Sequence, residues 1–161
     1  MVKVHRPWIV ITTALLGAAV VIAFLVFPFR SSPRLTLRND NTGKVFASYD
    51  VSEGDEFAIT FRHSVNKSNV TEIYRIQDGK IILTGCVYYD FGAGVAEVLE
   101  PTWKLTMGDN GEMIISEINM EMPDLVYIVG TIYDHIMTLN GEDIILNELC
   151  GKNAQVRFSV E

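Results

Sequence analysis

The sequence predicts an all-β domain, a β-sandwich or small barrel of about nine to eleven short antiparallel strands, preceded by one N-terminal transmembrane helix. Three observations lead to this prediction. Residues 8–29 form an apolar run without a charge, most segments after residue 34 alternate apolar and polar side chains, and turn-forming residues interrupt them at short intervals. The domain is therefore expected over residues 35–161.

The apolar run spans residues 8–29 and is 22 residues long. At a rise of about 1.5 Å per residue, a helix of this length crosses a hydrocarbon core of about 30 Å. The run ends in Phe27, Pro28 and Phe29 rather than in a small-x-small cleavage site, so the sequence favours an uncleaved anchor over a signal peptide. Residues 1–7 form a short tail, and residues 30–34 form a polar stalk.

Charge counting alone does not orient this anchor. Lys3 and Arg6 precede it, whereas Arg30, Arg34 and Arg38 follow it. A very short tail before one long domain favours a single-pass protein of the cell membrane whose C-terminal domain lies outside the cytoplasm. The opposite topology, with a cytoplasmic domain, stays open.

The folded part of the chain is acidic. Four of the 13 basic residues precede Leu35 and all 20 acidic residues follow it, so the remainder carries a net charge of about −11. Such a domain repels phosphate backbones, and we expect no nucleic-acid partner. The cysteines, Cys86 and Cys150, have no CxxC spacing, so no zinc site is expected. They either form one disulfide or remain two separate buried thiols.

Turn residues divide the first half of the domain into strands. Asn-Asp-Asn-Thr-Gly at 39–43 and Ser-Glu-Gly-Asp at 52–55 favour tight turns, and Asp78-Gly79 suits a two-residue hairpin. Alternation with period two places Phe57, Ile59 and Phe61 on one face of their strand. The expected strands are residues 35–39, 44–51, 56–63, 70–76 and 80–90.

The second half shows the same turn chemistry. Asn140-Gly141 predicts a second two-residue hairpin, and Asp-Asn-Gly at 109–111 predicts a third hairpin with a longer loop. The segment 124–135 suits either a short helix or a strand. The other expected strands are residues 103–107, 112–118, 135–139, 142–149 and 155–160.

One polar strip stands out, residues 61–72, "FRHSVNKSNVTE". Continued alternation points His63 inward and Ser64 outward, so His63 could simply be a structural residue beside the core. Alternatively, His63, Lys67 and Glu72 converge at a strand end, where imidazole, ammonium and carboxylate groups could bind a carboxylated or polar ligand.

An enzymatic interpretation is available but weaker. A serine nucleophile at Ser64 would follow His63 directly and so point to the opposite face of the strand, and no GxSxG motif is present. A metal or hydrolytic site would require His63 and His135 to meet beside an acid such as Asp134. We therefore expect no catalytic residue, metal or cofactor, and predict that the protein is not an enzyme.

Gly92, Ala93 and Gly94 follow an apolar strand. The third glycine and the helix of a dinucleotide-binding fingerprint are missing, so these residues predict no nucleotide site. They permit either a β-bulge or the close approach of a ligand to exposed backbone amides.

Taken together, His63-Ser64-Val65, Lys67, Glu72, the Gly-Ala-Gly at 92–94 and the hairpin at 135–149 resemble the family known as domain of unknown function 1850. The resemblance covers residues 57–149. Ser68 and Asn69 depart from it, because threonine and proline are usual at these two positions.

The resemblance implies a small exported or membrane-anchored protein, of a kind often encoded beside tripartite ATP-independent periplasmic transporters of the TAXI type. It implies a non-enzymatic accessory role, with transporter subunits or a small organic acid as partners and the membrane as a further partner through the N-terminal helix. The candidate ligand-binding residues that carry over are His63, Ser64, Lys67, Glu72, Gly92, Ala93 and Gly94. Two alternatives remain, a cell-surface enzyme using His63 and His135, and a purely structural module.

Overall fold

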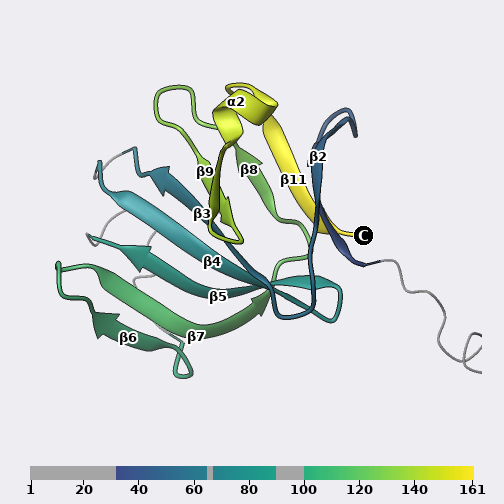
Figure 1. The fold of residues 1–161 in the computed structure, drawn as a ribbon. Helices are drawn as coiled ribbons and strands as arrows, with labels where there is room; N and C mark the ends of the chain where they lie inside the picture. Colours follow the sequence, from purple (N-terminus) through teal and green to yellow (C-terminus); the bar gives the residue numbers. More distant parts are fainter. Residues whose placement is uncertain (1–31, 65–66, 90–99) are drawn as a thin grey trace, which may run out of the picture. The chain divides into compact units, whose positions relative to one another are not determined.

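Two antiparallel sheets make up the part of the chain that the computed structural model describes, residues 32–64, 67–89 and 100–161 (Figure 1). The smaller sheet has the order β2 (Val45–Asp50), β1 (Arg34–Asn39), β11 (Gln155–Val160), β8 (Val126–Ile128). The larger sheet has the order β10 (Glu142–Ile145), β9 (Ile136–Leu139), β3 (Glu56–Arg62), β4 (Asn69–Gln77), β5 (Lys80–Tyr88), β7 (Met113–Glu121), β6 (Lys104–Met107). The all-β prediction is confirmed, with eleven strands among these residues.

The three predicted hairpins are present. Asp78 and Gly79 join β4 to β5 with φ angles of 52° and 69°, and Asn140 and Gly141 join β9 to β10 with φ angles of 53° and 80°. Both dipeptides therefore adopt the positive φ values for which Asp, Asn and Gly are suited. The third hairpin joins β6 to β7 around residues 109–111.

One segment takes one of the two conformations expected for it, and a second segment differs from its expected strand. The segment 124–135 contains the short strand β8 and no helix, and the segment 142–149, expected as a strand throughout, leaves the sheet at Ile145 and continues as the helix α2 (Leu146–Cys150). The side-chain amide of Asn147 in this helix donates to the Gly130 carbonyl at 2.7 Å and accepts from the His135 amide at 2.8 Å. These bonds tie α2 to the β8–β9 connection, a long-range contact that strand periodicity does not reveal.

The main core lies where the two sheets face each other. Phe57 of β3 is 2% exposed, and its ring stacks on Tyr74 of β4 at 5.0 Å and on Phe158 of β11 at 6.1 Å between ring centroids. Both sheets are open, because the larger ends at β10 and β6 and the smaller at β2 and β8. The barrel alternative is therefore wrong.

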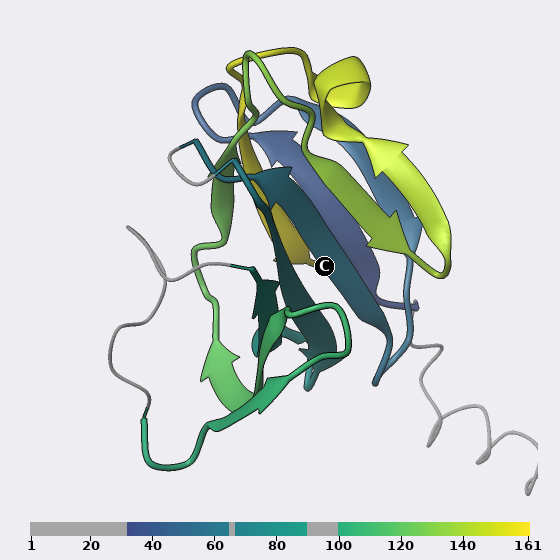
Figure 2. The ribbon, with the colours of Figure 1, turned by 90° about the vertical axis from the view of Figure 1, so that its left-hand side faces the viewer.

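A second, smaller apolar cluster lies toward the β6 edge of the larger sheet. Figures 1 and 2 show β7 and β6 at the opposite edge of that sheet from β9 and β10. The cluster is formed by Val70, Tyr88, Met113, Ile115 and Ile118. Because it is separate from the main core, the larger sheet has two apolar regions on its inner face, and the second of them holds a pocket.

The predicted anchor, residues 8–29, lies outside the described residues, and so do Gly92, Ala93 and Gly94. Within residues 32–64, 67–89 and 100–161, no helix is long and apolar enough to span a bilayer.

Candidate functional site

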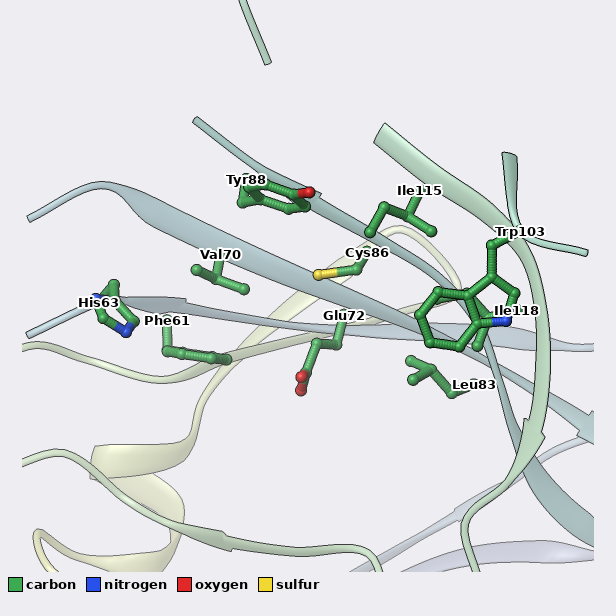
Figure 3. Close-up of a pocket in the computed structure, with 10 residues that line it drawn as sticks. All are labelled: Phe61, His63, Val70, Glu72, Leu83, Cys86, Tyr88, Trp103, Ile115 and Ile118. Atoms are coloured by element: carbon green, nitrogen blue, oxygen red, sulfur yellow. The ribbon is translucent and has the colours of Figure 1, made fainter. Parts of the chain in front are cut away.

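A pocket of about 180 Å³ opens beside the smaller apolar cluster (Figure 3). Its walls come from the end of β3, from β4, β5 and β7, and from the residue just before β6. We call it the Glu72 pocket, after the carboxylate near its centre in Figure 3. The lining residues are Phe61, His63, Val70, Glu72, Leu83, Cys86, Tyr88, Trp103, Ile115 and Ile118.

Glu72 is an acidic residue on the inner, apolar face of β4. Period two places it on the same face as Val70, Tyr74 and Ile76, which are all buried. A partly buried carboxylate needs hydrogen-bond donors, and two tyrosines supply them. The hydroxyls of Tyr74, at 3.0 Å, and of Tyr127 on β8 both donate to the same carboxylate oxygen, Oε2.

The two phenols keep their protons and stay donors. Burial, followed by the charge of Glu72, raises the pKa of Tyr74, and burial, followed by the neighbouring Tyr74 and Glu72, raises the pKa of Tyr127. Their hydroxyl oxygens lie 2.7 Å apart. Among the described residues, no cation pairs with Glu72 and no hydrogen bond reaches its other oxygen, Oε1. The carboxylate can therefore still accept a bond from a ligand.

His63 lies in the same pocket, one residue beyond β3. Its amide donates to the Ser68 carbonyl at 2.8 Å, and its carbonyl accepts from the Lys67 amide at 3.0 Å, so the chain turns back toward β4 at this point. The structure thus brings together two of the residues singled out in the sequence, His63 and Glu72, as linings of one pocket.

Ser64 and Lys67 lie elsewhere. They line a second pocket of about 260 Å³, together with Arg62 and the β8–β9 connection. The Lys67 ammonium donates to the Ser64 carbonyl at 2.5 Å, and Arg62 donates to the Lys67 carbonyl at 2.6 Å while its guanidinium carbon lies 4.8 Å from the Tyr133 ring centroid. Arg62 and Lys67 therefore brace their own turn, and neither lines the pocket that holds Glu72.

His135 lines the second pocket rather than the Glu72 pocket. Its Nδ1 accepts from the Gly130 amide at 3.1 Å, and its ring stacks on Phe61 at 5.4 Å between centroids. Burial lowers the pKa of His135 against smaller opposing effects, which favours the neutral ring. No group of three or more metal-ligating side chains occurs among the described residues, and neither pocket holds both His63 and His135.

A comparison with models of known protein families gives a match. The family described as "Domain of unknown function (DUF1850)" matches residues 57–146, more than half of the chain. The protein belongs to this family. No curated protein and no solved structure matches the chain.

The DUF1850 match covers nearly all of the larger sheet, from the second residue of β3 to the end of β10. Every residue that lines the Glu72 pocket or the second pocket falls inside it. The strands β1, β2 and β11 fall outside it. In this protein, the DUF1850 segment therefore carries both pockets, while three strands of the smaller sheet complete the main core.

Sequence reasoning missed the two hydroxyl donors of Glu72. For Tyr74 a signal existed, because Tyr74 follows Glu72 at the two-residue spacing that places both on one face. For Tyr127 there was none, since it is 55 residues from Glu72 in the sequence and belongs to the other sheet. Trp103 and Phe61 of the pocket were expected only as strand residues.

The two cysteines are free thiols in the structure, and we predict that they react slowly. Burial, and then the charge of Glu72, raises the pKa of Cys86 to about 12, and burial raises the pKa of Cys150 to about 11. Because only the thiolate reacts, iodoacetamide at about pH 8 should label Cys86 roughly a thousand-fold more slowly in the folded protein than in urea.

Timed labelling followed by mass spectrometry measures both rates. Equal rates in buffer and in urea would contradict the predicted protection. Two labelled cysteines after unfolding without reductant would confirm free thiols, whereas a disulfide would leave neither labelled.

Proposed function

We propose that this DUF1850 protein is a membrane-anchored, non-enzymatic accessory protein of a TAXI-type solute transporter, whose domain lies outside the cytoplasm and binds a small ligand. The observation that carries the proposal is the Glu72 pocket. It combines a mainly apolar lining with one carboxylate whose Oε1 accepts no hydrogen bond from the described residues. Binding sites for small molecules have this composition, with few polar groups that orient the ligand.

The side chains near the pocket support binding rather than catalysis. A general base or nucleophile must be able to exchange a proton with the substrate near neutral pH. The raised pKa values of Cys86 and of the two tyrosines keep these groups protonated. The two tyrosine hydroxyls hold the Glu72 carboxylate in place as a hydrogen-bond acceptor for a ligand.

The family resemblance suggests two kinds of partner, transporter subunits and a small organic acid. The charge in the pocket disfavours the second as its ligand. A simple organic anion would be repelled by the Glu72 carboxylate. The Lys67 ammonium, which the sequence suggested for pairing with an anion, lines the second pocket instead. The geometry therefore favours a ligand that presents a hydrogen-bond donor to Glu72.

The proposal predicts that Glu72→Gln impairs solute uptake in cells that carry it as their sole copy. Loss of a hydrogen bond to a charged group costs about 1.5–3 kcal/mol, so uptake at limiting solute should fall about ten-fold or more. The measurement is the initial rate of uptake, together with co-purification of transporter subunits with the tagged full-length protein from solubilised membranes.

Glu142→Gln is the matched control, because Glu142 is an exposed carboxylate on β10 that lines neither pocket. It should leave uptake unchanged. Wild-type uptake by the Glu72→Gln variant, together with the absence of transporter subunits from the purified wild-type protein, would overturn the proposed function.

A further inference from the structure

We infer that the ligand of the Glu72 pocket is a small organic ammonium cation. The inference rests on the proposed ligand-binding function and adds the chemical class of the ligand. Three features of the pocket carry it: an acidic group without a cationic partner among the described residues, an aromatic lining, and a small volume.

The first feature is the incomplete pairing of Glu72. Its Oε2 receives both tyrosine hydroxyls, and among the described residues neither a cation nor a hydrogen-bond donor reaches its Oε1. A carboxylate among apolar side chains is stabilised most by a positive charge that also donates a hydrogen bond or lies in contact. A cationic ligand would supply that charge.

The second feature is the aromatic lining. Phe61, Tyr88 and Trp103 all line the pocket. In Figure 3, Phe61 and Trp103 lie on opposite sides of Glu72, and Cys86 lies between Glu72 and Tyr88. Aromatic rings attract cations through their quadrupole, and rings combined with a carboxylate are the usual recognition chemistry for alkylated ammonium groups. The aliphatic lining residues would accommodate the ligand's alkyl groups.

The third feature is size. Pockets for drug-sized ligands measure about 300–1,000 Å³, whereas this one measures about 180 Å³. A hard metal cation does not fit the lining, because Ca²⁺ takes about six to eight oxygen ligands and the pocket offers one carboxylate. The acidic charge of the domain also raises the local concentration of cations over anions.

Trp103 allows a direct binding experiment. The chain has two tryptophans, and replacing the other one, Trp8→Phe, leaves Trp103 as the only tryptophan reporter. The full-length protein, in a maltoside detergent that carries no ammonium group, is titrated with three probes of similar shape. The probes are choline, neohexyl alcohol and the tert-butylacetate anion. Neohexyl alcohol has a carbon atom in place of the choline nitrogen, and the tert-butylacetate anion carries a carboxylate.

Choline is expected to bind and to change the fluorescence of Trp103. Its dissociation constant should be at least about ten-fold lower than that of neohexyl alcohol, because the choline cation can contact both the aromatic rings and the nearby carboxylate. Tert-butylacetate should bind most weakly. Glu72→Gln should remove the preference for choline, and Glu142→Gln should keep it. The comparison of the three probes in the protein that keeps Glu72 tests the ammonium inference even if the Glu72→Gln variant fails to fold.

The outcomes separate the two proposals. If neohexyl alcohol or tert-butylacetate binds as tightly as choline, the ammonium inference is overturned while ligand binding stands. If choline's advantage persists in a folded Glu72→Gln variant, the inference is also overturned, because Glu72 is then not its source. If none of the three probes changes Trp103 fluorescence, both the ligand-binding proposal and the ammonium inference are overturned.

Discussion

Phe57→Ala is expected to lower the free energy of unfolding of the domain by about 3–5 kcal/mol, the range found when a large buried aromatic side chain is truncated. Phe57 is 2% exposed and stacks on one aromatic ring from each sheet, Tyr74 and Phe158. Its removal therefore takes away apolar burial and leaves a cavity at the contact between the two sheets. Because domains of this size are stable by only about 5–15 kcal/mol, the loss would be a large fraction of the total.

Urea denaturation of the full-length protein in detergent, carried out in the Trp8→Phe background and followed by Trp103 fluorescence, measures the change. Met107→Ala is the matched control, because Met107 is a large apolar side chain on the edge strand β6 and is 64% exposed. That variant should change stability by less than about 0.5 kcal/mol. A loss of less than about 1 kcal/mol for Phe57→Ala would show that the two sheets do not share this core.

Tyr127→Phe is expected to destabilise the domain by about 1–3 kcal/mol, the cost of leaving a partly buried charged acceptor without one of its donors. The phenylalanine ring preserves the packing of Tyr127 on Phe61 and Phe158, so the loss reports the hydroxyl that donates to Glu72. Tyr74→Phe removes the other donor and should cost a similar amount. The losses should fall in the lower half of this range, because Glu72 is partly exposed to solvent.

A double-mutant cycle tests whether the two hydroxyls act through Glu72. The effect of Tyr127→Phe should shrink by at least about 0.5 kcal/mol in a Glu72→Gln background, since residues of one hydrogen-bond network are non-additive. Tyr49→Phe is the control, because the Tyr49 hydroxyl makes no hydrogen bond within the described part of the chain. Additive effects of Tyr127→Phe and Glu72→Gln would contradict the network.

Short-range chemistry accounts for what the sequence determined. Asp78-Gly79 and Asn140-Gly141 predicted two hairpins because positive φ angles are a property of the residues themselves. Period two likewise placed Glu72 and Tyr74 on one face of β4. The motif around His63, together with Gly92-Ala93-Gly94 and the hairpin at 135–149, resembled the DUF1850 family, to which the chain belongs. The N-terminal anchor and the location outside the cytoplasm remain predictions.

Only the tertiary structure decided which of these groups meet. The polar strip divides between two pockets at the end of β3, where His63 lines the Glu72 pocket while Ser64 and Lys67 of the following turn line the second pocket. Glu72 acquires Tyr127 because β8 lies in the other sheet, next to β11, and so places a hydroxyl across the core. Sequence periodicity specifies the face of a strand, but the partner across that face depends on how the sheets pack.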